Sequence, residues 1–135
     1  MEKILASCDH VGLLTNNARG LEGFYMEKFG FKKEKETVME KVLFSKIFGI
    51  DSSAKFIRLK APNMKLEIFE PVSLALEKHT DKTAGFNHWG YVVGHRAEFC
   101  AGLKRKNVDV IEVEIKGDIK YFVKDPDANL IEIRD

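Results

Sequence analysis

Apolar residues along the chain follow two different spacings, and the two alternate in a regular order. Between residues 21 and 29 they recur every three or four positions, which predicts an amphipathic helix that begins after Asn16–Asn17 and ends at Gly30. The same spacing predicts a second helix over Ala97–Lys106. Alternating or short apolar runs between turn signals predict strands. These strands are Ser7–Thr15, Phe31–Lys35, Val38–Leu43, Lys55–Ala61, Met64–Phe69, Asn87–Val93, Asp109–Ile115, Lys120–Lys124 and Asn129–Ile133.

Turn and loop signals separate these segments. Pro62–Asn63 predicts a hairpin between the two strands that flank it, and Asp125–Asp127 predicts a turn before the last strand. The stretch Ser45–Ser53 is expected to be a loop with a local turn. Ser73–Lys78 is expected to form a helical turn within a polar connection.

The order strand, helix, three strands occurs twice, and the two halves can be aligned. Asp9–Leu14 (DHVGLL) matches Asn87–Val92 (NHWGYV), and Lys65–Glu70 (KLEIFE) matches Leu130–Asp135 (LIEIRD). Each half therefore opens with a strand that carries a histidine and closes with a strand that carries a glutamate. These two residues are 57 positions apart in the first half and 44 in the second, so 13 additional residues are placed in Val38–Ser53.

Length and composition exclude several classes of protein. The 135 residues, 44% of them apolar, suit a single domain with a real core, and the formal net charge of +1 gives no reason to expect a nucleic-acid or anionic membrane partner. No apolar run approaches the roughly 20 residues that a membrane-spanning helix needs, and Met1–Leu5 is expected to lead into a strand rather than a signal peptide. Cys8 and Cys100 are expected to be buried free thiols in a soluble cytoplasmic protein, with a catalytic thiol as the lesser alternative.

Four polar residues occupy equivalent places in the two halves: His10, Glu67, His88 and Glu132. Taken singly, each would more often be an ordinary core or surface residue. Taken together, they could converge if the halves pack as a pseudo-two-fold pair. Side chains on a strand alternate between faces, so the glycine two positions after each histidine leaves open space beside the imidazole. Each glutamate lies between two apolar residues, and an embedded carboxylate needs a partner.

A metal ion is one partner that this set of donors suits. Two imidazoles and two carboxylates favour one divalent cation of the borderline class, namely Ni, Zn, Co, Mn or Fe. Ligation by four side chains can leave one or two positions for water or substrate, and such open positions are typical of a catalytic rather than a structural metal.

The sequence also resembles a known group, the vicinal oxygen chelate superfamily. This group includes glyoxalase I, methylmalonyl-CoA epimerase, extradiol dioxygenases and proteins of fosfomycin and bleomycin resistance. The resemblance covers essentially the whole chain. The residues that carry it are Asp9–Gly12, Phe24–Tyr25, Phe29–Phe31, Leu66–Ile68, Asn87–His88 and Tyr121–Glu132.

The resemblance implies an α+β fold in which two βαβββ modules form an open, cup-like mixed sheet around a metal site. The modules would cover about residues 5–70 and 86–135 of a single glyoxalase-like domain spanning residues 1–135. The family's ligands carry over to the same four residues named above. One departure is Ala128, where the family usually has glycine, and this could alter the preferred dihedral angles of the turn.

The ligand set resembles glyoxalase I more than its relatives. Epimerases of the family often carry glutamine at the second ligand position, and extradiol dioxygenases use two histidines and one glutamate. The resemblance implies that the metal polarises a substrate carbonyl, that Glu67 or Glu132 removes the adjacent proton, and that the enediolate is stabilised; Glu132 is favoured as the base. Small bacterial glyoxalase I proteins have arginine where this chain has Leu14, so use of glutathione stays open. Arg58 and Lys60 could serve an anionic substrate instead, or could be ordinary surface cations.

The function expected on these grounds is a metal-dependent lyase or isomerase, similar to lactoylglutathione lyase, that acts on a small carbonyl substrate. Two alternatives use the same fold: a non-catalytic small-molecule binder of the resistance type, and an Fe(II) extradiol-type dioxygenase. Members of the family commonly form homodimers, and the metal site can lie within one chain or between two.

Overall fold

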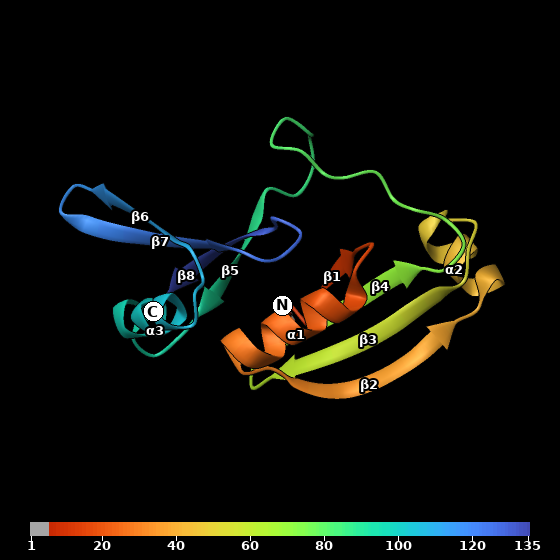
Figure 1. Ribbon diagram of the computed structural model, residues 1–135, viewed down its shortest axis with the longest axis horizontal. Helices are drawn as coiled ribbons and strands as arrows, with labels where there is room; N and C mark the ends of the chain where they lie inside the picture. Colours follow the sequence, from red (N-terminus) through yellow and green to blue (C-terminus); the bar gives the residue numbers. More distant parts are fainter. Residues whose placement is uncertain (1–5) are drawn as a thin grey trace, which may run out of the picture. The chain divides into compact units, whose positions relative to one another are not determined.

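The computed structural model describes residues 6–135, which form eight strands and three helices (Figure 1). The chain divides into two compact units, the first ending at Glu77 and the second covering Lys78–Asp135. In chain order the elements are β1 (His10–Leu14), α1 (Ala18–Phe29), β2 (Lys32–Met39), α2 (Lys41–Phe48), β3 (Ala54–Ala61), β4 (Met64–Pro71), β5 (His88–Val92), α3 (Arg96–Arg105), β6 (Val110–Ile115), β7 (Asp118–Lys124) and β8 (Leu130–Arg134).

The two units repeat one topology, as the internal repeat in the sequence predicts. The sheets have the orders β1-β4-β3-β2 and β5-β8-β7-β6, and each is open and mixed. The first strand of each unit pairs in parallel with the last, and all other neighbours are antiparallel. Register is also repeated, because Gly12 lies opposite Glu67 and Gly90 lies opposite Glu132. The predicted α+β fold with two βαβββ modules is thus confirmed.

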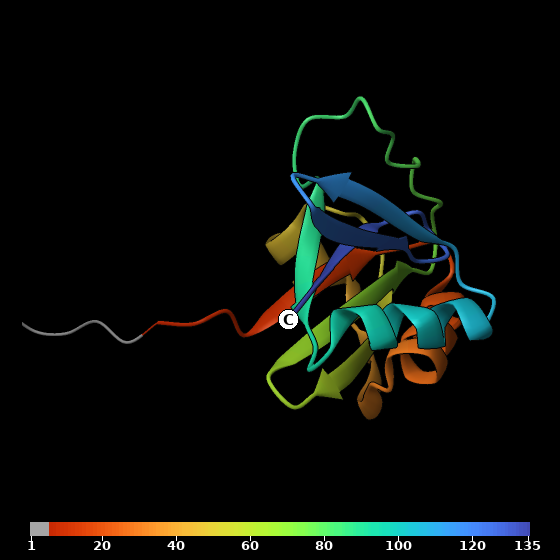
Figure 2. The same ribbon diagram turned by 90° about the vertical axis from the view of Figure 1, so that its left-hand side faces the viewer.

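Helix α1 covers one face of the first sheet (Figure 1, Figure 2). It begins where the Asn17 side chain accepts a hydrogen bond from the Gly20 N–H, and it ends at Gly30 in the left-handed conformation. Its buried side chains are Ala18, Leu21, Tyr25 and Phe29. Burial of each large apolar side chain contributes roughly 1.5–3 kcal/mol. The sheet residues that alternate away from α1 are left for other contacts.

Helix α2 corrects the prediction for residues 38–53. One strand, β2, takes the place of the expected strand Phe31–Lys35 and of the beginning of the expected strand Val38–Leu43. Helix α2 takes the place of the end of the second expected strand and of the first part of the loop expected at Ser45–Ser53. Phe44 and Phe48 lie one helical turn apart, with ring centroids 5.1 Å apart, and both contact Phe69 of β4. Burial of Phe44 against Phe69 favours the helical conformation over the expected strand. Because the second unit has no counterpart, α2 accounts for the additional residues placed in this region.

Smaller differences concern the ends of elements. Strand β1 begins at His10 rather than at Ser7, and residues 73–78 contain no helical turn. The expectation that the N-terminus leads into a strand falls on Met1–Leu5, outside the described residues. Among residues 6–135, no helix is both long and apolar enough to cross a membrane.

The two cysteines differ in environment. Cys100 of α3 is fully buried, as expected, and burial raises the pKa of its thiol to about 11, with a smaller contribution from Glu112. Cys8 precedes β1 and is exposed, so the expectation that it would be buried was wrong. The apolar residues near Cys8 in the sequence belong to β1, which begins two residues later at His10.

The turn between β7 and β8 carries Ala128, where the family usually has glycine. The Asp125 carboxylate accepts hydrogen bonds from the Asp127 and Asn129 N–H groups and from the Asn129 side chain. These bonds hold Ala128 at φ 65°, in the left-handed region. For a residue with a Cβ this conformation costs roughly 1–2 kcal/mol.

We expect Ala128→Gly to stabilise the protein by about 0.5–1 kcal/mol, because relief of the strained dihedral exceeds the added entropy of the unfolded chain. Thermal unfolding should then shift upward by about 2–5 °C. The matched control is Ala101→Gly in α3, which should destabilise by roughly 1 kcal/mol. A midpoint for Ala128→Gly at or below that of the parent protein would contradict the strain argument.

We expect iodoacetamide at pH 8 to label Cys8 and to leave Cys100 unmodified in the folded protein. The thiolate is the reactive form, and the raised pKa of Cys100 keeps its thiol protonated until the pH approaches 11. Intact mass measured against time should show one alkyl group per chain, and two after unfolding in guanidinium. Modification of Cys100 at the rate of Cys8 would show that α3 opens readily.

Candidate metal centre

In the first unit, the predicted ligands His10 and Glu67 lie on adjacent parallel strands. The His10 Nε2 atom is 3.2 Å from Glu67 Oε1, and the Glu67 side chain is only 15% exposed. On its other side, His10 Nδ1 lies 2.8 Å from Asp9 Oδ2. A Cβ placed on Gly12 would meet no atom within 4 Å, so the open space predicted beside the imidazole is present.

The second unit repeats this arrangement. His88 Nε2 is 3.6 Å from Glu132 Oε1, and His88 Nδ1 is 2.7 Å from Asn87 Oδ1. The Glu132 side chain is 18% exposed. A Cβ on Gly90 would likewise meet no atom within 4 Å. Each histidine is therefore held at Nδ1 by the residue that precedes it, and each turns Nε2 toward a glutamate.

The Nδ1 contacts decide which nitrogen of His10 carries its proton. The hydrogen bond to His10, followed by the charge of Lys65, lowers the pKa of the Asp9 carboxyl, so Asp9 is an acceptor. His10 Nδ1 must then donate. A neutral imidazole would turn the lone pair of Nε2 toward an oxygen of Glu67. Two acceptors this close repel each other unless a cation or a proton lies between them.

This geometry fits a metal ligand. A histidine that binds a metal usually donates its other N–H to a carboxylate or carbonyl, which fixes the ring and the tautomer. Asp9 and Asn87 supply such acceptors to His10 and His88. Sequence reasoning used these two residues only as part of the family pattern. Their place just before each histidine was the available signal.

Arg58 of β3 distinguishes the first unit from the second. Its Nε and Nη2 atoms lie 3.0 and 2.9 Å from Glu67 Oε2, while Glu34 is more distant at 3.8 Å. Arg58 lies directly opposite Glu67 in the sheet. The sequence analysis considered Arg58 for a substrate anion, whereas the structure pairs it with a predicted ligand.

The residue that lies opposite Glu132 in the second sheet is Phe122, which cannot form an ion pair. Its ring is edge-on to His88, with centroids 6.0 Å apart. The Arg134 Nη1 atom is 3.8 Å from Glu132 Oε2. The two His–Glu pairs thus share the same strand register, but Arg58 binds the Glu67 carboxylate whereas Phe122 lies opposite Glu132.

A cavity of about 370 Å³ opens beside Glu67 within the first unit. Its polar lining includes Arg58 and Lys35, both positioned over the ring of Phe56, and Phe69 supplies an apolar wall. The cavity therefore joins a predicted ligand to two cations and an apolar surface, which is the composition of a small-molecule pocket.

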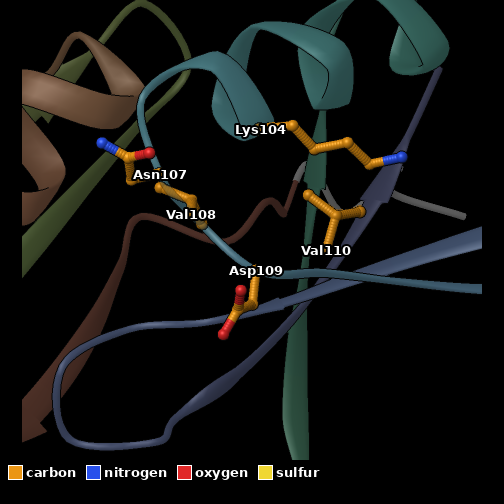
Figure 3. Close-up of a pocket in the computed structure, with 5 residues that line it drawn as sticks. All are labelled: Lys104, Asn107, Val108, Asp109 and Val110. Atoms are coloured by element: carbon orange, nitrogen blue, oxygen red, sulfur yellow. The ribbon is translucent and has the colours of Figure 1, made fainter.

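A second cavity, of about 420 Å³, lies in the other unit where α3 leads into β6 (Figure 3). Figure 3 shows Lys104 and Asp109 pointing in different directions, and no predicted ligand lines this cavity. Lys104 pairs with Glu112 instead. The cavity therefore has no convergent polar groups.

The structure brings the four predicted ligands together as two pairs, His10 with Glu67 and His88 with Glu132. Among residues 6–135, no cluster of three or more His, Cys, Asp or Glu side chains stands in metal-binding geometry. The four-ligand centre therefore stays a prediction.

Comparison with known proteins identifies the family. The model of the Glyoxalase/Bleomycin resistance protein/Dioxygenase superfamily matches residues 7–133. Among curated protein sequences, none matches this chain.

Solved structures show the same fold at low sequence identity. A glyoxalase family protein from Enterococcus faecalis is 22% identical, with a TM-score of 0.72 over 96% of this chain and 97% of its own. The trypanothione-dependent glyoxalase I of Leishmania major is 19% identical, with a TM-score of 0.69 over 97% and 87% of the two chains. Lactoylglutathione lyase from Agrobacterium tumefaciens is 15% identical, with a TM-score of 0.65 over 97% and 94%.

The family match spans nearly the whole chain, and it agrees with the repeated βαβββ units and with the two equivalent His–Glu pairs. The chain therefore belongs to the Glyoxalase/Bleomycin resistance protein/Dioxygenase superfamily.

Proposed function

We propose that the protein is a metal-dependent lyase or isomerase of the glyoxalase I type, acting on a small carbonyl substrate. One observation carries the proposal: in both units a histidine anchored at Nδ1 turns Nε2 toward a glutamate oxygen. One divalent ion (Ni, Zn, Co, Mn or Fe) would be held by His10, Glu67, His88 and Glu132. Bound there, such an ion supplies polarisation of a substrate carbonyl and stabilisation of the negative charge that develops on it.

The side chains of this chain divide the remaining work. His10 and His88 bind through Nε2, with their rings held by the preceding residues. Arg58 occupies Oε2 of Glu67, which leaves Oε1, the oxygen beside His10, as the ligand atom. Glu67 is therefore suited to the role of a fixed metal ligand rather than of a base.

Glu132 is suited to move a proton. Within residues 6–135 no arginine fork holds its carboxylate, since its partner across the sheet is Phe122 and Arg134 reaches it only at 3.8 Å. In the proposed reaction an oxygen of Glu132 takes the proton from the carbon next to the substrate carbonyl. The same oxygen then returns the proton to that carbon or to its neighbour.

Arg58 also supports one of the alternatives. If it keeps Glu67 from binding metal, the remaining set is two histidines and Glu132, which is the ligand set of non-haem Fe(II) oxygenases. Oxygen uptake with a catechol would then replace carbonyl isomerisation. A non-catalytic binder of the resistance type is the third candidate, and failure to bind metal would favour it.

Two further proposals concern the protein's setting. The exposed thiol of Cys8 suits a reducing compartment such as the cytoplasm, where free cysteines persist. We also propose a homodimer, on the resemblance to the family.

We expect the wild-type protein, purified without chelator or immobilised metal, to contain about one first-row metal ion per chain. His88→Ala should lose this metal because one of four ligands is removed. Asp9→Ala should keep the ligands but weaken metal affinity roughly 10- to 100-fold. Metal content by plasma mass spectrometry and affinity by competitive titration are the measurements.

The matched control is His79→Ala, which removes a histidine from the exposed connection between β4 and β5. It should bind metal like the wild type. A wild-type protein that contains no metal, and gains none from Ni, Co, Zn, Mn or Fe(II), would refute the enzyme proposal.

We expect Glu132→Gln to retain most of the metal and to lose roughly 10²- to 10⁴-fold in kcat, as removal of a general base does. Glu67→Gln should instead lower metal affinity. Both variants would be assayed with the hemithioacetal of methylglyoxal and glutathione and with acyl-CoA substrates, and Glu77→Gln in the connection serves as control. Full activity in Glu132→Gln, or oxygen uptake on catechol by the Fe(II) form, would contradict the assignment.

A further inference from the structure

The face of the first sheet that turns away from α1 is ordered in rows, and we call it the site face. It consists of the side chains of β1–β4 that share a side with Glu67. Strand pairing defines three rows across it. The first row is Leu14, Phe69, Phe56 and Thr37; the second is Gly12, Glu67, Arg58 and Lys35; the third is His10, Lys65, Lys60 and Lys32.

The third row places three lysines directly opposite one another on adjacent strands. Lys32 faces Lys60, and Lys60 faces Lys65. Side chains that are directly opposite in an antiparallel pair have Cβ atoms about 5 Å apart, and like charges in this position destabilise the sheet. Within the described part of the chain, none of the three lysines forms an ion pair.

Cations on the other face of the same sheet behave differently. Lys33 lies next to Lys32 in sequence and pairs with Glu22 and Glu36, and Arg19 pairs with Glu36 as well. The Asp9 carboxylate accepts from His10, and this hydrogen bond, followed by the charge of Lys65, lowers the pKa of Asp9. Carboxylates therefore neutralise Arg19 and Lys33 on the α1 side, and Glu67 pairs with Arg58 on the site face, whereas no ion pair is found for the third-row lysines among the described residues.

The position of the row relates it to the proposed reaction centre. Successive rows on one face of a strand are two residues apart, which is about 7 Å. The lysine row lies one row from Glu67 on one side, and the aromatic pair Phe56 and Phe69, stacked at 4.9 Å, lies one row from it on the other. Across the site face, the first row is therefore largely apolar, the second holds the Arg58–Glu67 ion pair, and the third is cationic.

We propose that Lys32, Lys60 and Lys65 form an oxyanion-binding subsite, which takes a phosphate or carboxylate group of the substrate about 7 Å from its reacting oxygens. Three ammonium groups for which the described residues provide no ion pair can donate to such a group together. The proposal rests on the proposed function, because it places the anion relative to Glu67. It names the substrate as a carbonyl compound with an anionic tail, whose apolar part lies on the Phe56 side.

The test uses the full chain freed of metal with a chelator, so that anion binding is measured apart from metal binding. Inorganic pyrophosphate and succinate are titrated separately at matched ionic strength, and amide chemical shifts are followed by NMR. The variant is Lys60→Ala, the central member of the row. Its control is Lys55→Ala, on the same strand but on the opposite face.

At least one of the two anions should shift the signals of residues 32, 60 and 65 in the wild type. Lys60→Ala should bind it about tenfold more weakly, and Lys55→Ala should bind it as the wild type does. Which anion binds identifies the group as phosphate or carboxylate. Binding of neither anion, or equal weakening in both variants, would overturn the subsite. Because no metal is present, either result leaves the metal measurements to decide the proposed function separately.

Discussion

The parallel pairing of the first and last strands in each unit positions each predicted histidine ligand beside a glutamate. It places Gly12 opposite Glu67 and Gly90 opposite Glu132, so that each histidine, one row away on the same face, reaches a glutamate oxygen. A slip of one residue would turn every side chain of a strand to the other face. The apolar neighbours of each glutamate, buried on the helix side, oppose that slip.

The two halves share this backbone frame and differ in the side chain opposite the glutamate. Arg58 fixes one oxygen of Glu67, and Phe122 leaves Glu132 without such a fork. Because the strand register is the same but the opposing side chains differ, Glu67 and Glu132 can have different roles in the proposed reaction. Glu67 would be a fixed ligand, and Glu132 would carry the proton. The same difference explains why the glyoxalase-type and Fe(II) oxygenase readings both deserve a test, since they differ in whether Glu67 binds the metal.

Much of this could be predicted from the sequence because the decisive signals are local. The repeated His-x-Gly and Glu-Ile patterns identified the equivalent strands of the two halves, though not their parallel pairing, and α1 begins after Asn17 and ends at Gly30 as expected. Helix α2 was missed because the pattern of Val38–Leu43 also fits a strand. The packing of Phe44 and Phe48 on Phe69, together with the left-handed Gly49 at its end, favours the helix. The Arg58–Glu67 pair depends on hairpin register. That register was available from the turn at Pro62–Asn63 but was not used to pair the two residues.

Helix α2 gives the first unit a feature that the second lacks. Phe44 packs with Ala54, Phe56 and Phe69, so the apolar end of the site face is closed. At the cationic end the lysines remain exposed or half-buried. A ligand on this face is therefore oriented by two unlike constraints: its apolar part gains by leaving water at the closed end, and its charged part keeps both water and ammonium groups at the open end. The orientation follows from the solvation of the two ends of the ligand.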